Sequence, residues 1–357
     1  MKTELEPKIL RFADGTEVKN AEDFKKRRAE MLDILAREEY GYMPPVMGET
    51  RLKFIGEPEY ICAGMALLRR AEVSFDTPKG EFSFPVKLMT PDDGEKHPCF
   101  LFNNFQDLTY HHYLPIEEII AHQYSVALIY YNDITSDNND MSDKLAGMYD
   151  RADDGTGYGK ITLWAFAMSR LLDRLGDCPG FDAENVASIG HSRLGKTSLW
   201  CGANDERIKL VISNDSGCGG ASSERIKHKG AEKISDMAVN FPFWFCENRS
   251  KYIDKPDEMP FDQHFLLACA APRYLSVGSA EKDTWADPYS EQLSCFNASP
   301  AWEIQGFCGY TGKEEPAEIG ESFDGGRISY HIRRGTHFLS RTDWLYYMKV
   351  FDNVIGR

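Results

Sequence analysis

The chain has 357 residues, of which 42% are apolar and 27% charged, a composition typical of a globular protein with a substantial buried core. It carries 41 basic and 56 acidic residues, which gives a formal net charge of −15. This balance argues against binding to nucleic acid or to an anionic membrane, because both need clustered lysine and arginine.

The chain opens on a short polar segment. Its first residues lack the apolar core of a signal peptide, so we expect a cytoplasmic protein, or a secreted one if a leader peptide has been removed. No run of consecutive apolar residues is long enough to form a membrane-spanning helix. Apolar side chains at helical spacing predict an amphipathic helix over 21–39, and alternation predicts strands between 51 and 90. We expect this N-terminal part, 1–96, to pack on the sheet of the remaining chain.

After residue 97, short apolar runs alternate with helical segments. The runs begin at residues 99, 125, 186, 209 and 274, and helices are predicted over 115–122, 163–175, 197–203, 261–270 and 344–354. This pattern is typical of a mostly parallel sheet with helices on both faces, an α/β fold in three layers. We predict one domain over 1–357, with its core in 97–357. Two long insertions, at about 132–160 and 214–260, are expected at the carboxyl edge of the sheet.

The nine cysteines are scattered along the chain. They form no C-x-x-C pair and lack the spacing of zinc ligands. We interpret most of them as small buried apolar residues in a reducing compartment. No metal and no cofactor is expected.

The stretch from Gly190 to Thr197 matches two motifs at once. As G-x-x-x-x-G-K-[ST] it fits the P-loop, in which backbone amides hold phosphates, Lys196 reaches them and Thr197 binds magnesium. As a strand-to-helix turn it fits the nucleophile elbow, which exposes a serine, here Ser192. The usual elbow has a small residue two positions after the serine, whereas this chain has Leu194 there and a glycine one position later.

Chain order separates the two interpretations. A P-loop normally follows the first strand of its domain, but several predicted strands precede residue 190. An elbow requires an acid and then a histidine downstream. Asp283 follows the predicted strand that begins at residue 274, and His337 precedes the final helix. We therefore favour the elbow and keep a nucleotide-binding P-loop protein as the alternative from another class.

Five sequence blocks occur in one order along the chain. They are Ser-Arg-x-Gly-Lys from Ser192, Asn-Asp-Ser-Gly-Cys-Gly-Gly from Asn214, Pro-Phe-Asp-Gln-His up to His264, Asp-x-Trp-Ala-Asp-Pro from Asp283, and Gly-x-His up to His337 followed by Asp343-Trp344. This set resembles the glucuronoyl esterases, carbohydrate esterase family 15, and their bacterial branch more closely than the fungal one. The resemblance covers about residues 97–357, and the N-terminal part more weakly. It implies an α/β-hydrolase fold and hydrolysis of the ester that joins 4-O-methylglucuronic acid of xylan to lignin alcohols.

The resemblance implies catalytic roles for single residues. Ser192 would be the nucleophile of a catalytic triad and His337 its base. Asp283 stands where bacterial members place their acid, and Asp215 stands where fungal members carry a glutamate instead, so either could be the acid. Arg193 matches the arginine that helps to stabilise the oxyanion.

Three further residues match contacts to the uronate sugar: Lys196, Trp285 and Glu232. The spacing around Glu232 is shifted, and taken alone this residue is interpreted as a solvated charge. Fungal members form a disulfide bridge between cysteines beside the serine and the histidine. Here those neighbours are His191 and Phe338, so that bridge does not exist.

This set of residues suits ester hydrolysis. A serine hydroxyl attacks once a base takes its proton, and histidine titrates near neutral pH. We expect a metal-independent serine esterase that acts on a carbohydrate uronate ester through an acyl-enzyme. A deacetylase of acetylated xylan or sugars with the same machinery stays open, as does a non-catalytic carbohydrate-binding relative. His331 is the rival base, and Trp244 and His264 are interpreted as core or supporting residues.

Overall fold

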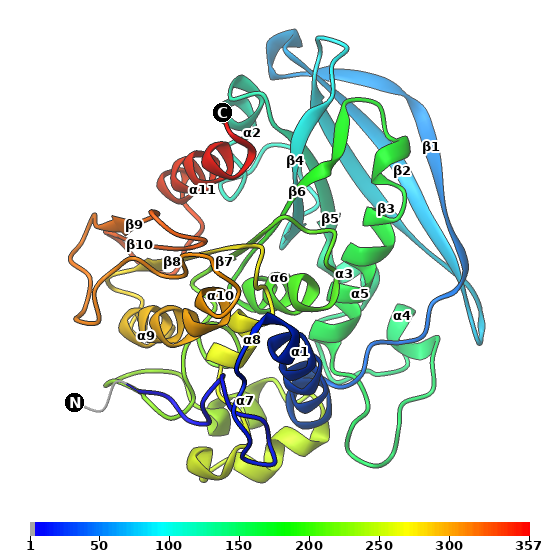
Figure 1. The fold of residues 1–357 in the computed structure, drawn as a ribbon. Helices are drawn as coiled ribbons and strands as arrows, with labels where there is room; N and C mark the ends of the chain where they lie inside the picture. Colours follow the sequence, from blue (N-terminus) through cyan, green and yellow to red (C-terminus); the bar gives the residue numbers. More distant parts are fainter. Residues whose placement is uncertain (1–3) are drawn as a thin grey trace.

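A ten-stranded sheet organises the chain in the computed structural model, which describes residues 4–357 (Figure 1). The first three residues of the predicted N-terminal part lie outside the described residues. The strand order is β1-β2-β3-β5-β4-β6-β7-β8-β10-β9. The strands are β1 Met47–Ile61, β2 Ala66–Thr77, β3 Gly80–Pro91, β4 His97–Asn104, β5 Ser125–Tyr130, β6 Phe181–His191, β7 Leu210–Asn214, β8 Tyr274–Ala280, β9 Ser322–Phe323 and β10 Ile328–Arg333.

Helices cover both faces of this sheet. They are α1 Ala21–Leu35, α2 Ile116–Ala121, α3 Tyr131–Ile134, α4 Lys144–Gly147, α5 Lys160–Leu172, α6 Arg193–Asn204, α7 Ile234–Asn240, α8 His264–Ala268, α9 Pro288–Ala298, α10 Pro300–Glu303 and α11 Arg341–Ile355. A π-helical turn, Ala36–Tyr40, extends α1, so the predicted helix over 21–39 is confirmed. Within residues 4–357, no helix combines the length and the apolar character that crossing a bilayer requires.

The centre of the sheet is parallel and its outer part antiparallel. Strands β5, β4, β6, β7, β8 and β10 run parallel, while β1, β2 and β3 form a meander that joins the sheet where β3 pairs with β5. The central strands are buried on both faces, which explains their continuous apolar sequences. The outer β2 instead alternates buried and partly exposed positions, as expected where one face meets solvent.

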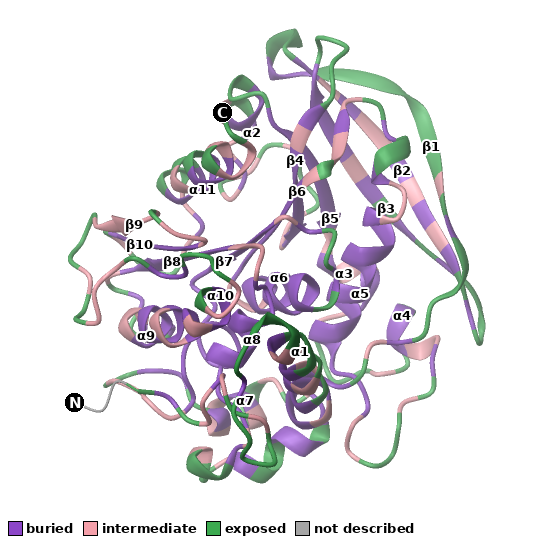
Figure 2. Ribbon diagram, viewed as in Figure 1, coloured by how far each residue is buried: buried purple, intermediate pink, exposed green. Residues whose placement is uncertain are grey.

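Neighbouring side chains of one strand enter different cores. Leu101 of β4 packs with α5 and α6, whereas Phe100 and Phe102 pack with α2 and α11. Figure 2 shows the central strands buried between these layers, and α6 buried along most of its length. The predicted three-layer α/β fold is therefore confirmed. The order of strands, with the elbow between β6 and α6, is that of an α/β-hydrolase.

Helix α9 has no counterpart among the predicted helices, and the predicted helix over 261–270 is only the five residues of α8. The buried face of α9 includes the polar residues Ser290, Glu291, Gln292 and Ser294, so the apolar stripe that marks a helix in sequence is missing. Its start is set by Asp287, which accepts a hydrogen bond from the backbone of Ser290. The two long insertions follow β5 and β7, at the carboxyl edge of the parallel strands.

Candidate active site

Ser192 occupies a strained turn between β6 and α6. Its backbone has φ 58° and ψ −127°, in a region that residues with a side chain rarely adopt. A Cβ on Gly190 would lie 2.0 Å from the carbonyl oxygen of Leu194, so only glycine fits two positions before the serine. The second close approach is at Gly195, where a Cβ would lie 3.1 Å from Cβ of Ser216. The helix therefore needs its small residue one position later than the usual motif, and Leu194 is free to enter the core. This geometry is that of a nucleophile elbow.

His337 and Asp283 form a hydrogen-bonded pair beside the elbow. Nδ1 of His337 lies 2.5 Å from Oδ2 of Asp283, a buried carboxylate just beyond the end of β8. The backbone N–H of Lys282 donates to the carbonyl of Gly335 and thereby joins the two loops that carry the pair. The ring of His337 packs against His191 with 4.4 Å between centroids. Among the described residues Nε2 of His337 has no hydrogen-bond partner.

Asp215 lies close to the same histidine but bonds elsewhere. One of its oxygens accepts from the N–H of Ala280 at 2.8 Å, and the other lies 3.4 Å from both the N–H of Phe338 and the guanidinium of Arg333. Burial and the nearby charge of Asp283 raise the pKa of Asp215 well above its usual value, which favours its uncharged form. Oxygens of the two carboxylates and a ring nitrogen of His337 all lie within 4.8 Å of one another. Asp283 is the carboxylate that accepts the direct hydrogen bond of the imidazole.

The rival base His331 is held within β10. It is buried, and its Nε2 lies 3.0 Å from Oδ1 of Asp343, which also binds Arg333. His331 is absent from the cavity that holds the elbow. His337, in contrast, lines that cavity together with Ser192.

The three sugar-contact candidates come together in the cavity that holds the elbow. A cavity of about 210 Å³ is lined by Ser192, His337, Lys196, Glu232 and Trp285. Oε1 of Glu232 accepts from the indole N–H of Trp285 at 2.6 Å, and its other oxygen lies 3.6 Å from Nζ of Lys196. Nζ also donates to the carbonyl of Ser216 at 2.6 Å.

The interpretation of Glu232 as a solvated charge is wrong. Its exposed fraction is 5%, because its backbone N–H donates to the carbonyl of Trp285 and draws its loop over the cavity. Trp285 itself is 46% exposed and offers a free ring face.

Arg193 lines the same cavity, in contacts that the sequence did not suggest. Its guanidinium forms an ion pair with Asp137 and stacks on Trp244, with 4.5 Å to the ring centroid. Trp244 is a buried residue, as interpreted, but it also lines the cavity, together with Phe241. The aromatic run at 241–245 inside a polar insertion was the available signal for these two rings, whereas Asp137 is one of several aspartates in its loop.

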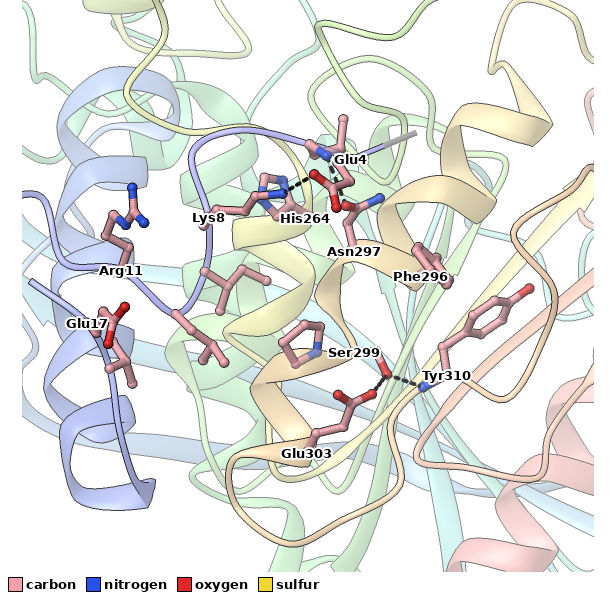
Figure 3. A pocket seen from close by; sticks show the side chains of 15 residues that line it. Glu4, Lys8, Arg11, Glu17, His264, Phe296, Asn297, Ser299, Glu303 and Tyr310 are labelled. Atoms are coloured by element: carbon pink, nitrogen blue, oxygen red, sulfur yellow. Dashed lines mark hydrogen bonds and ion pairs between the residues drawn. The ribbon is translucent and has the colours of Figure 1, made fainter. Parts of the chain in front are cut away.

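A larger cavity, of about 570 Å³, lies between the N-terminal segment and α9 and α10 (Figure 3). Its lining includes Ser299 and His264, but neither is arranged for catalysis. Oγ of Ser299 donates to Glu303 at 2.7 Å, and Nε2 of His264 donates to the carbonyl of Pro7 at 2.9 Å. Ser299 has helical backbone angles, so no elbow is present there.

The P-loop interpretation fails on the same local geometry. Lys196 turns its ammonium toward Ser216 and Glu232, and the hydroxyl of Thr197 donates back to the carbonyl of Arg193 within α6. With the elbow in the middle of a mostly parallel sheet, the fold and the site define a carboxylic ester hydrolase of the α/β-hydrolase class.

Known proteins resemble this chain along almost its whole length. The sequence model of the family described as "Glucuronyl esterase, fungi" matches residues 75–306. A carbohydrate esterase from an unknown prokaryotic organism is 33% identical over 97% of this chain and 89% of its own length. The solved glucuronoyl esterase of Solibacter usitatus has a TM-score of 0.88 and 31% identity, and the match covers 98% of this chain and 97% of that one. A 4-O-methyl-glucuronoyl methylesterase of Podospora anserina is 28% identical over 83% of this chain but only 59% of its own length.

The chain belongs to the glucuronoyl esterase family. The prokaryotic esterase and the Solibacter usitatus enzyme are more similar to this chain than the Podospora anserina enzyme, and their matches cover more of both chains, as the sequence blocks predicted.

Proposed function

We propose that the protein hydrolyses esters in which the carboxyl group of glucuronic acid, or of its 4-O-methyl ether, is joined to an alcohol of the lignin–carbohydrate type. The observation that carries this proposal is the convergence in one cavity of the elbow serine, the histidine that pairs with Asp283, and the trio of Lys196, Glu232 and Trp285. The relatives named for glucuronoyl ester hydrolysis support the same substrate class.

The catalytic cycle follows from the positions of these groups. Oγ of Ser192 attacks the ester carbonyl while Nε2 of His337 takes its proton. Asp283 holds Nδ1 and stabilises the imidazolium that forms. The imidazolium then gives the proton to the leaving alcohol, and the glucuronoyl group remains bound to Ser192. Water, activated by the same histidine, releases glucuronate and restores the serine.

The developing oxyanion needs donors that are already in place. The N–H of Arg193 stands at the first turn of α6, where backbone donors have no partner within the helix. The guanidinium of Arg193 adds a positive charge to the same cavity. Both groups come from the residue that follows the nucleophile, so the elbow brings nucleophile and donors together.

The trio of Lys196, Glu232 and Trp285 suits a sugar acid. The half-exposed ring of Trp285 offers a flat apolar face for the pyranose, and Glu232 and Lys196 offer an acceptor and a donor for its hydroxyl groups. A substrate esterified at its carboxyl group is uncharged there, which fits an acidic protein better than a free anion would.

Release of glucuronate from benzyl glucuronate tests this proposal. We expect release by the wild type, a drop in kcat of roughly 10⁴–10⁶ for Ser192→Ala, and full activity for the matched control Ser250→Ala, an exposed serine whose hydroxyl bonds only Glu247. Comparison of this rate with the rate on the corresponding 4-O-methylglucuronate ester shows whether the protein requires the methyl ether. If the wild type releases acetate from acetylated xylan but no glucuronate, the protein is a deacetylase instead.

A further inference from the structure

Asp137 contacts three side chains near the active site, those of Arg193, Tyr131 and Trp244. Its Oδ2 accepts from Nη1 of Arg193 and lies 3.3 Å from the hydroxyl of Tyr131. Its Oδ1 accepts from the indole N–H of Trp244 at 2.7 Å. The carboxylate is 13% exposed and the arginine side chain 25%, so the pair is only partly screened by water.

The arginine is also enclosed by rings. Its guanidinium carbon lies 4.5, 5.4 and 5.5 Å from the ring centroids of Trp244, Phe241 and Phe105. None of the residues 4–357 accepts a hydrogen bond from its Nε or Nη2. Asp137 thus holds the guanidinium through Nη1, Nε is buried, and Nη2 remains to donate to another acceptor in the cavity.

The loop that carries Asp137 is itself braced. Nζ of the buried Lys160, at the start of α5, donates to the carbonyls of Ser136 and Asp140 at 2.6 and 2.8 Å. The N–H of Ser136 donates to Asp143 at 2.8 Å. The residues on both sides of Asp137 are therefore fixed, and the carboxylate has a defined place from which to hold its partner.

We infer that Asp137 is a positioning residue for the oxyanion: it holds the guanidinium of Arg193 so that the N–H groups of Nη2 meet the charge that develops on the ester oxygen. This inference rests on the proposed function, which places Arg193 beside that oxygen. A flexible arginine would have to be ordered in each turnover, whereas a guanidinium fixed in advance needs no such reorganisation. Asp137 does not touch the substrate, and its effect passes entirely through Arg193.

A double-mutant cycle tests the inference. Asp137→Ala should lower kcat on benzyl glucuronate by about tenfold to a hundredfold, part of the 10²–10³ typical of a lost oxyanion donor, with KM changed by less than about threefold. In an Arg193→Ala background the same change should lower kcat by less than about twofold, because the group it positions is gone. Asp137→Asn keeps an acceptor for Trp244 and should recover part of the activity. The matched control is Asp140→Asn, an exposed aspartate of the same loop whose side chain bonds Ser142.

Two results would overturn the inference. One is an equal loss of kcat from Asp137→Ala with and without Arg193, which would mean a structural role for the loop. The other is an unchanged kcat in folded Asp137→Ala and Asp137→Asn proteins, with folding checked by thermal unfolding. If the wild type does not hydrolyse benzyl glucuronate, the proposed substrate fails instead, and the same cycle is then measured on 4-nitrophenyl acetate, which needs the elbow and oxyanion donors but no sugar contacts.

Discussion

Replacing Asp283 and Asp215 separately by asparagine distinguishes the two carboxylates beside His337. Asp283 contacts Nδ1 at 2.5 Å, whereas Asp215 is engaged with backbone N–H groups and the guanidinium of Arg333. Burial and the charge of Asp283 raise the pKa of Asp215. Asp283 is therefore the carboxylate whose charge acts on the imidazole.

The size of the expected effect follows from that charge. An imidazolium and a carboxylate about 4 Å apart attract each other by about 4 kcal/mol at an effective dielectric constant of about 20, which corresponds to roughly a thousandfold in rate. An asparagine amide also holds the imidazole in the wrong tautomer. We expect Asp283→Asn to lower kcat by about 10³–10⁴. The surroundings of Asp215 favour its uncharged form, so Asp215→Asn exchanges one uncharged group for another. We expect it to lower kcat by less than about tenfold.

The assay is kcat for benzyl glucuronate at neutral pH, with thermal unfolding of each variant to show that it is folded. The reverse order, a loss of about a thousandfold in Asp215→Asn with near-normal Asp283→Asn, would refute this reasoning. It would mean that the loop holding His337 turns toward Asp215 during turnover.

Three further perturbations test the site and its frame. Trp285→Ala should raise KM roughly threefold to tenfold, as expected for the loss of one aromatic contact, and should change kcat by less than about twofold. Initial-rate kinetics with a changed kcat and an unchanged KM would contradict a role of the Trp285 ring in binding the sugar. Gly190→Ala would place a Cβ 2.0 Å from the carbonyl oxygen of Leu194 and should lower the melting temperature sharply. In the control Gly176→Ala the new Cβ meets its nearest neighbour at an ordinary 3.5 Å, so its melting temperature should change little. Equal melting temperatures for the two variants would contradict the close packing of the elbow. Burial lowers the pKa of His264 to about 3, while an unfolded histidine titrates near 6.5. Below that pH the unfolded state binds a proton that the folded state does not, so His264 destabilises the fold by about 2 kcal/mol at pH 5. Urea unfolding of His264→Gln should therefore lose less stability between pH 7.5 and pH 5 than the wild type, and an identical loss would count against the buried neutral imidazole.

Much of the fold could be predicted because its signals are local. A parallel strand buried on both faces must be apolar at every position, and the runs that begin at residues 99, 125, 186, 209 and 274 became β4, β5, β6, β7 and β8. The elbow could be predicted for the same reason, since the constraints on Gly190 and Gly195 arise within one turn and its neighbouring loop. Helix α9 escaped prediction because its buried face binds polar partners, among them Glu291 with the N–H groups of Ser216 and Gly217.

The contacts within the site depend on residues far apart in the chain. Asp283 meets a histidine 54 residues away, and Asp137 meets an arginine 56 residues away. Glu232 was interpreted as a surface charge because no residue near it in the sequence indicates that its carboxylate is buried and accepts a hydrogen bond from Trp285.

By itself the sequence determined the α/β fold class, the elbow turn at Ser192 and the order of a serine, a carboxylate and a histidine along the chain, because these depend on short-range periodicity and on turn chemistry. Only the tertiary structure decided which carboxylate binds His337, that Glu232 is buried, and that Asp137 holds Arg193. Such hydrogen bonds form between loops that meet at the carboxyl edge of the sheet, and the spacing along the chain does not record which side chains those loops bring within 3 Å.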